Sequence, residues 1–205
     1  MNRSTAAVLA TVLTCLLVTV ALPLSFPSAG PTGFDRSADD RLHAALDGHH
    51  GVYRVLVTPS DPWVVLPILL AAALWYLRSD RWRAGFLVVA PELAVLVNTA
   101  ALKPMWHRHL KDYLAYPSGH TVQFVAVATA LVLVAATRRV RAILATLSVV
   151  LLAAVAVGMV GVGYHYPTDI LGGTATAVGL VTAQWATVRG RFAANPPAGF
   201  SARRP

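Results

Sequence analysis

Long uninterrupted apolar runs constrain this chain more than any other feature of its sequence. Six of them approach the length of a bilayer span, and polar or basic stretches separate them. A helix needs about 20 apolar residues to cross the hydrocarbon core of a membrane, where lipid offers the backbone no hydrogen-bond partner, so each run predicts a helix. The expected spans are about 5–24, 62–77, 84–102, 118–136, 142–163 and 170–188.

The composition agrees with a membrane protein. Of the 205 residues, 56% are hydrophobic and only 13% are charged, which is too apolar for an ordinary soluble domain. The formal net charge of +8 does not indicate nucleic-acid binding, because most of the basic residues flank apolar runs. We therefore expect an all-α polytopic membrane protein with the lipid bilayer as its partner, no nucleic acid, and a single domain over residues 1–205.

The distribution of arginine predicts the orientation. With six spans, both termini lie on one side of the membrane, and that side collects eleven arginines. The opposite side holds six basic residues and seven of the nine acidic ones. Because basic residues are enriched in cytoplasmic loops, we expect cytoplasmic termini and a cytoplasmic tail over about 189–205. The Ala-, Val- and Arg-rich composition indicates a bacterial source, so the expected location is the inner membrane of the cell envelope.

The first outer loop, about residues 25–61, is a long polar stretch that opens with several proline and glycine residues. Within it, Phe34 and Leu42 share a helical face that opposes Asp35 and Asp39. This pattern predicts a short amphipathic helix lying on the membrane surface. The apolar run before the loop also fits a cleaved signal peptide, because a positive N-terminus precedes both kinds of segment.

The run Pro117-Ser118-Gly119-His120 stands at the start of the fourth apolar segment. Ser is a favoured N-cap, and the first-turn N–H groups of a helix, assisted by its dipole, form an anion site. Gly119 lets the backbone approach an anion closely, and His120 could donate a proton to a leaving oxygen. The same residues also fit a capped helix whose interfacial histidine has no chemical role.

His165 and Asp169 lie on either side of the break between the last two spans. Pro167 cannot continue the fifth helix, so His165 ends one span and Asp169 begins the next. A carboxylate beside an imidazole fixes its tautomer and raises its nucleophilicity. The pair therefore predicts either a nucleophilic histidine or an interfacial contact that only ties two spans together.

Basic residues cluster in the loop that precedes Ser118. Lys103 ends the third apolar segment, and Arg108 and Lys111 follow it. Because basic residues are depleted on an outer face, we interpret this cluster as a clamp for phosphate oxygens, with the arginine fork as the better match. The histidines of the motif region, at 107, 109, 120 and 165, lack the paired spacing of zinc ligands. We therefore expect no metal and no cofactor.

Two polar residues, Glu92 and Asn98, lie within the third apolar segment. Ionisable residues inside a span are functional candidates. Glu92 equally fits a contact with a neighbouring span, so its role stays open at this point.

The three polar runs, which together occupy about residues 103–169, resemble the type-2 phosphatidic acid phosphatase superfamily of lipid phosphate phosphatases. The pattern of that family is Lys-x6-Arg-Pro, then Pro-Ser-Gly-His, then Ser-Arg-x5-His-x3-Asp. Residues 117–120 match the second motif, His165 and Asp169 match the end of the third, and Lys103 matches the start of the first. The six-span layout is similar to that of the bacterial integral-membrane branch, and the resemblance covers roughly residues 60–190.

The sequence departs from that pattern in two places. Leu110-Lys111 stands where the first motif has Arg-Pro, and Gly158-Met159 stands where the third has Ser-Arg. Two phosphate-binding arginines are therefore missing from their expected positions. Arg108 lies in the same loop as Leu110, near enough to serve in a re-shaped loop.

The resemblance implies a metal-independent phosphoric ester or diphosphate hydrolase at the outer membrane face. His165 would attack phosphorus to form a phospho-histidine, Asp169 would orient His165, and His120 would protonate the leaving lipid alkoxide. The phosphate would be held by Lys103, Arg108, Ser118 and Gly119. Polyprenyl phosphates or diphosphates, phosphatidylglycerophosphate and phosphatidic acid are the candidate substrates. The missing arginines keep a second function open, a catalytically weak or inactive phosphate-lipid binding or transport protein on the same scaffold.

Overall fold

The computed structural model describes residues 3–46 and 50–194, and over these ranges the chain is almost entirely helical. The elements in chain order are α1 (Arg3–Ala21), η1 (Leu22–Ser25), η2 (Pro27–Ala29), α2 (Gly33–Leu46), α3 (His50–Val57), η3 (Thr58–Ser60), α4 (Pro62–Leu77), α5 (Arg81–Val97), η4 (Asn98–Leu102), α6 (Lys103–Trp106), β1 (His109–Leu110), β2 (Tyr113–Leu114), α7 (Gly119–Val134), α8 (Arg138–Val162) and α9 (Pro167–Ala194). The predicted all-α polytopic membrane fold is confirmed. Residues 195–205 of the predicted tail lie outside the described ranges.

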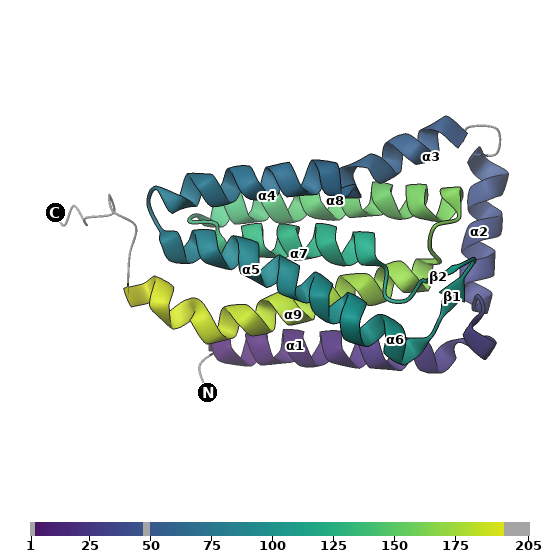
Figure 1. Ribbon diagram of the computed structural model, residues 1–205, viewed down its shortest axis with the longest axis horizontal. Helices are drawn as coiled ribbons and strands as arrows, with labels where there is room; N and C mark the ends of the chain where they lie inside the picture. Colours follow the sequence, from purple (N-terminus) through teal and green to yellow (C-terminus); the bar gives the residue numbers. More distant parts are fainter. Residues whose placement is uncertain (1–2, 47–49, 195–205) are drawn as a thin grey trace.

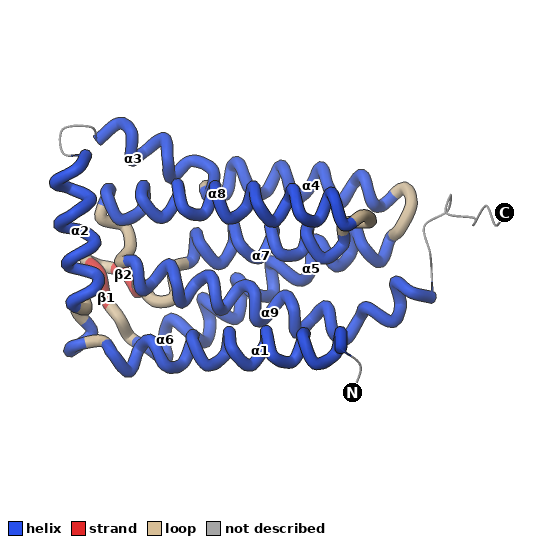
Figure 2. Tube along the Cα trace, turned by 180° about the vertical axis from the view of Figure 1, so that it is seen from behind, coloured by secondary structure: helices blue, strands red, loops and turns tan. Residues whose placement is uncertain are grey.

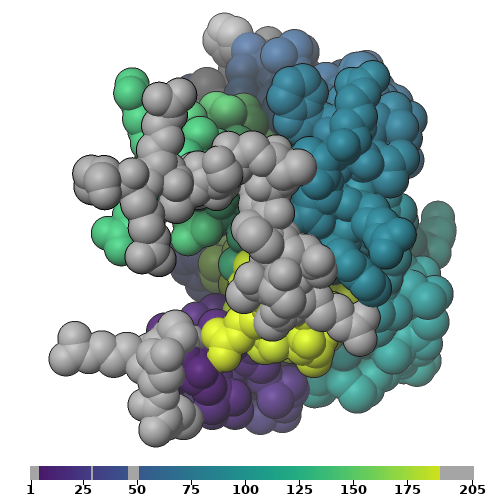
Figure 3. Space-filling view, turned by 90° about the vertical axis from the view of Figure 1, so that its left-hand side faces the viewer, coloured from purple at the N-terminus to yellow at the C-terminus, as the bar shows by residue number. Residues whose placement is uncertain are grey.

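The long helices lie side by side in one bundle, and α2 crosses one end of it (Figures 1 and 2). Among the described residues, α1, α4, α5 with its continuation through η4 and α6, α7, α8 and α9 form the bundle. The start of α1 and the end of α9 lie together at the end opposite α2, and Figure 3 views that end with α1 in purple and α9 in yellow.

Four helical stretches within the described residues are long and apolar enough to cross a membrane, judged by length and composition. They are Thr5–Ser25, Gly51–Leu77, Arg81–Trp106 and Arg138–Val162. The helix Gly119–Val134 is apolar but shorter. It lies at the centre of the bundle, where Val122, Ala126 and Ala130 are fully buried. A helix that is apolar all round is typical of such a central position.

Two boundaries differ from those expected. The fifth span was expected to begin at about residue 142, but Arg138 to Arg141 form the first turn of α8, because the Thr137 side chain accepts a hydrogen bond from the Val140 N–H (3.2 Å) and caps the helix. The outer loop also holds a second helix, α3, which packs on α8. Gly161 allows this contact, since a Cβ there would lie 2.3 Å from the Tyr53 ring.

Helix α2 is the predicted amphipathic helix, with one correction. Asp35 was expected on the polar, solvent-facing side, but its side chain is completely buried. Thr32 and Asp35 form a reciprocal cap at the start of α2, in which the Thr32 N–H donates to Asp35 Oδ2 (2.9 Å) and the Asp35 N–H donates to Thr32 Oγ1 (3.1 Å). This capping box turns the carboxylate inward, toward the end of the bundle.

The polar residues inside α5 and η4 differ in their surroundings. Glu92 lies on the exposed side of α5. Asn98, in contrast, is fully buried and donates from Nδ2 to the Pro117 carbonyl (3.4 Å). Asn98 therefore ties the end of the third span to the loop that precedes α7.

Candidate active site

The three polar runs meet at the end of the bundle that α2 covers (Figure 1). The first run comprises α6 and the β1–β2 hairpin, in which His109 pairs with Leu114 and Leu110 with Tyr113. The second run is the start of α7, and the third is the turn between α8 and α9. Residues that are up to 66 positions apart in the sequence, from Lys103 to Asp169, are thus brought together.

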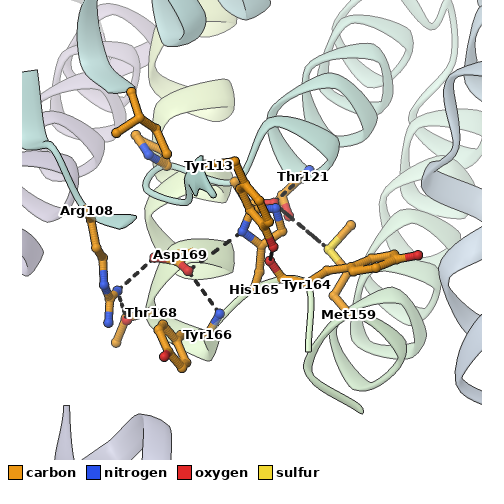
Figure 4. Close-up of polar contacts among 12 residues, drawn as sticks. Arg108, Tyr113, Thr121, Met159, Tyr164, His165, Tyr166, Thr168 and Asp169 are labelled. Carbon is orange, nitrogen blue, oxygen red and sulfur yellow. Dashed lines mark hydrogen bonds and ion pairs between the residues drawn. The ribbon is translucent and has the colours of Figure 1, made fainter. Parts of the chain in front are cut away.

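His165 faces Asp169 across the turn between α8 and α9 (Figure 4). Its Nδ1 lies 3.7 Å from Asp169 Oδ2, and the imidazole is only 6% exposed. The turn forms because Gly163 ends α8 in the left-handed conformation, with φ of 72°. Since Nδ1 faces the carboxylate, Nε2 is the ring nitrogen left for chemistry.

The position of Asp169 is fixed from several directions. Its Oδ2 accepts the Tyr166 N–H (2.9 Å), and its Oδ1 accepts Arg108 Nη1 (2.7 Å). Its backbone carbonyl accepts the Ser118 N–H (3.1 Å). The same residue therefore lies beside the imidazole of the third run and holds the loop of the second run next to it.

The start of α7 has the expected cap. Ser118 has extended backbone angles, and its Oγ accepts the Thr121 N–H (3.4 Å) and the Thr121 hydroxyl (3.0 Å). The Val122 N–H is bonded to the Ser118 carbonyl. Within the described residues, the N–H groups of Gly119 and His120 are left as the first-turn donors for an anion. Because the Ser118 hydroxyl is buried and already paired, its main contribution is to shape this turn.

Lys103 and His120 lie on the same side of this helix start. The Lys103 Cε is 3.8 Å from the point that a Cβ on Gly119 would occupy, and Nζ donates to the Leu114 carbonyl. The electrostatic neighbours of His120 include His165, Lys103 and Asp61. Lys103 therefore lies beside the start of α7, and Lys103 and His165 are both charged neighbours of His120.

Arg108 lies in a different environment from the phosphate clamp expected from the sequence. It is fully buried, and its guanidinium is stacked against the rings of Phe26 (3.7 Å) and Tyr166 (4.8 Å). Both of its Nη groups are bonded to protein oxygens, including the carboxylates of Asp169 and Asp35. This geometry does not support the predicted contact between Arg108 and phosphate, because the guanidinium is already bonded to two carboxylates.

Met159 and Leu110 occupy the two positions where the family pattern has arginine. Met159 is fully buried, and its sulfur accepts from the Ser118 hydroxyl (4.0 Å) and the Thr121 hydroxyl (3.8 Å). Leu110 lies in the β1–β2 hairpin, followed by the exposed Lys111, whose Nζ is 3.8 Å from the point that a Cβ on Gly163 would occupy. Neither Met159 nor Leu110 can supply a positive charge. The positive potential beside the start of α7 therefore comes from Lys103 and from the N-terminal end of the helix dipole.

The ring of Tyr113, in the β1–β2 hairpin, packs edge-on against the ring of His165. The two rings are 6.0 Å apart at 78°, and the phenol donates to the Tyr164 carbonyl. Burial and the nearby negative charge of Asp169 raise the pKa of Tyr113. The phenol therefore stays protonated as a donor, and the contact fixes the hairpin to the turn that carries His165.

Two adjacent glycines allow α9 to lie against the second run. A Cβ on Gly172 would lie 2.1 Å from the Tyr116 ring, and a Cβ on Gly173 would lie 2.9 Å from the Ser118 carbonyl. Tyr116 is itself fully buried, and its hydroxyl donates to the Thr19 carbonyl of α1 (2.7 Å). Without side chains at these two positions, Asp169 and Ser118 can approach within hydrogen-bonding distance.

An apolar cavity of about 310 Å³ opens beside the site, between α2, α8 and α9. Its lining residues are Phe34, Ala38, Leu42, Ala156, Val157, Val160, Pro167, Ile170 and Leu171. Two of them, Ile170 and Leu171, follow Asp169 directly in the sequence. The cavity therefore lies on α9 next to the turn that carries Asp169.

Sequence reasoning missed two residues that contact the site, Asp35 and Thr168, and a third, Asp61, that acts on it electrostatically. Asp35 and Thr168 bind Arg108, and Asp61 is an electrostatic neighbour of His120. The spacing of Thr32 and Asp35 matches a capping box and could have placed the start of α2. It could not have shown that the acid points into the bundle.

The model of the PAP2 superfamily matches residues 63–193 of the chain. Among solved structures, the chain is similar to one described as the first transmembrane PAP2 type phosphatidylglycerolphosphate phosphatase from Bacillus subtilis, with 17% sequence identity and a TM-score of 0.67. The match covers 88% of this chain and 96% of that chain, and at this identity it shows a shared fold. The search of curated proteins found no match.

Proposed function

The chain belongs to the PAP2 superfamily, and on that premise we propose that it is a membrane phosphatase that hydrolyses a lipid phosphomonoester or diphosphate through a phospho-histidine. The observation that carries this proposal is the arrangement around His165. Its Nδ1 faces Asp169 at 3.7 Å, and His165 and Lys103 are both electrostatic neighbours of His120. A nucleophile oriented by a carboxylate and set beside an acid and a cation is what phosphoryl transfer requires.

In the first step, Nε2 of His165 forms a bond to phosphorus as the bond from phosphorus to the lipid oxygen breaks. His120 donates its proton to that oxygen, and the lipid leaves as an alcohol or, from a diphosphate, as a monophosphate. In the second step, water attacks phosphorus, the N–P bond breaks, and His120 takes up a proton from the water. Inorganic phosphate leaves, and His165 is regenerated.

The phosphate oxygens would be held by Lys103 and by the N–H groups of Gly119 and His120, with Ser118 capping the turn. Charge develops on these oxygens in the transition state, and donors fixed in a partly buried site stabilise it most. Arg108 remains a proposed phosphate ligand only if its bonds to Asp35 and Asp169 open. The burial of its guanidinium favours a role away from the phosphate.

The substrate class is supported by the apolar cavity beside α9. Its lining is entirely hydrophobic, and it adjoins Asp169 through Ile170 and Leu171. The name of the similar solved protein makes phosphatidylglycerophosphate one member of the test panel, with phosphatidic acid and polyprenyl phosphates and diphosphates as the others. We also propose that the site faces outward and the termini face the cytoplasm, following the arginine distribution.

The test is phosphate release by the purified protein on that panel. We expect His165→Ala to abolish turnover without loss of folding, whereas His120→Ala should spare substrates with good leaving groups, which need little protonation. His109→Ala is a matched control, because His109 lies in the same loop but is exposed on the hairpin. A chelator should leave turnover unchanged. Activity that is lost in EDTA and restored by zinc would contradict the metal-free mechanism.

A second function is favoured by one observation, the burial of Met159 and Arg108 at or near the places where the family supplies phosphate-binding arginines. With fewer free cations, the protein could bind a phosphate lipid without hydrolysing it. The two functions separate in one experiment. Saturable binding of a lipid phosphate with no phosphate release from any member of the panel would establish binding or transport over hydrolysis.

A further inference from the structure

The carboxylate of Asp35 lies inside the candidate active site, although it belongs to the outer-loop helix α2. Its Oδ1 accepts the Thr168 N–H (3.0 Å), and its Oδ2 accepts Arg108 Nη2 (2.9 Å), the Thr168 hydroxyl (2.9 Å) and the Thr32 N–H (2.9 Å). The side chain is completely buried. Burial opposes ionisation, but the hydrogen bonds from Thr32, Thr168 and Arg108 outweigh it and lower the pKa of Asp35. Asp35 is therefore an anion at neutral pH.

Arg108 bridges this anion to Asp169. Nη1 donates to Asp169 Oδ1 (2.7 Å) and to the Thr168 hydroxyl (2.7 Å), and Nη2 donates to Asp35 Oδ2 and to the Gly30 carbonyl (3.0 Å). Because a guanidinium is a rigid plane, fixing one edge of it fixes the other. The carboxylate of Asp35 thus determines where Arg108 meets Asp169.

The charges in this cluster also matter for His165. Two carboxylates share one guanidinium, so the cluster carries a net charge of −1 beside the imidazole. When Nε2 attacks phosphorus, the ring becomes cationic, and a negative cluster on its Nδ1 side stabilises that charge. If Asp35 were neutral, Arg108 and Asp169 would cancel and the stabilisation would weaken.

We infer that Asp35 is a positioning residue of the active site, acting through Arg108 and Thr168 to hold Asp169 opposite His165. It lies outside residues 63–193, which the family model matches. The first outer loop therefore completes the site from outside the family core. This inference rests on the proposed function, since it assigns a role in the same reaction.

The test compares Asp35→Asn with Asp40→Asn, an exposed carboxylate on the same helix. Asn keeps the shape and removes the charge. We expect Asp35→Asn to lower kcat about tenfold while the KM for the lipid and the inhibition constant for inorganic phosphate stay within about twofold. Asp40→Asn should match the wild type. A purely structural role would instead lower the unfolding midpoint and leave kcat per folded molecule unchanged, and that result would overturn the inference.

Two further variants keep the inference testable if Asp35→Asn folds poorly. Thr168→Val removes one hydroxyl that links Asp35 to Arg108, and we expect a threefold to fivefold loss of kcat with phosphate inhibition unchanged. The double variant Asp35→Asn, Arg108→Gln should have nearly the same kcat as Arg108→Gln alone, because Asp35 acts through Arg108. If the losses of kcat were additive, Asp35 would not act through Arg108. Weaker inhibition by phosphate in Arg108→Gln would make Arg108 a phosphate ligand instead.

Failure of the inference is distinguishable from failure of the proposed function. If the wild type releases phosphate and His165→Ala does not, but Asp35→Asn equals the wild type, only the role of Asp35 is wrong. If the wild type releases no phosphate from any lipid of the panel, the proposed function itself is wrong.

Discussion

The contact between Gly172 and Tyr116 gives a prediction whose size follows from the geometry. In Gly172→Ala, the new Cβ would lie 2.1 Å from Tyr116 Cε2 and 2.5 Å from Cζ. Non-bonded carbon atoms prefer a separation of about 3.5 Å or more. Helix α9 and the Tyr116 ring must therefore separate by about 1.4 Å at this point.

The ring of Tyr116 has little freedom to make that space. It is fully buried, its hydroxyl donates to the Thr19 carbonyl, and its ring edge meets Phe26 at a centroid distance of 5.1 Å. Overpacking of this kind costs about 1–3 kcal/mol. The better helix propensity of Ala returns up to about 1 kcal/mol. The difference is a net destabilisation of about 0–2 kcal/mol. Because the ring has little freedom to move, we expect the upper half of this range, about 1–2 kcal/mol, and larger values if Tyr116 loses its hydrogen bond.

Activity should fall as well. The same displacement moves Tyr116-Pro117-Ser118 away from α9, and it lengthens the bond from the Ser118 N–H to the Asp169 carbonyl. The assay is unfolding of the purified protein in detergent, followed in parallel with phosphate release. Gly85→Ala is the matched control, because a Cβ on Gly85 meets nothing within 4 Å, and it should stabilise α5 by about 0.5–1 kcal/mol. Equal unfolding midpoints for the two variants would refute the steric reasoning.

Four further outcomes can be measured with the same preparations. Lys103→Ala should lower kcat/KM about a hundredfold and weaken inhibition by inorganic phosphate, because Lys103 is the cation beside the start of α7; unchanged phosphate inhibition would remove it from the binding site. Leu171→Trp should fill the apolar cavity and raise the KM for long-chain lipid phosphates but not for a short water-soluble phosphate ester, whereas Leu74→Trp on α4 should affect neither. In a Cys15→Ser background of intact cells, cysteine at position 112 should react with an impermeant thiol reagent and cysteine at position 139 should not; the reverse pattern would invert the proposed orientation. Because the pKa of Asp35 is lowered in the folded protein, its contribution to stability is present above about pH 4 and is lost as the pH falls through the lower, folded-state value; Asp35→Asn should therefore show a smaller loss of stability on acidification than the wild type does.

The parts of this molecule that follow from local pattern could be predicted from the sequence. Apolar runs of bilayer length place the helices, since a buried backbone in lipid must satisfy its own hydrogen bonds. Pro117-Ser118 predicts a capped helix start, and Pro167 predicts the turn that sets His165 against Asp169. Each of these depends on residues within a few positions of one another.

The parts that depend on long-range packing could not be predicted. Arg108 was expected to bind phosphate because basic residues are depleted on an outer face and a guanidinium matches phosphate oxygens. Its surroundings in the structure come from Phe26 and Asp35, more than 70 positions away in the sequence, and from Thr168 and Asp169, 60 or more positions away. Asp35 was assigned to a polar face by its spacing alone, and spacing along a helix cannot reveal what lies opposite that face.

The neighbouring positions of α1 and α9 have a consequence for how the protein is made. These are the first and last long helices of the described chain, and they pack along each other. Thr19 of α1 accepts the hydroxyl of Tyr116, which α9 in turn approaches through Gly172. A polypeptide emerging from the ribosome can insert its early helices in order, but Asp169 and Gly172 arrive only with α9. A chain arrested before α9 would leave Tyr116 without the helix that packs against it and His165 without the carboxylate that faces it.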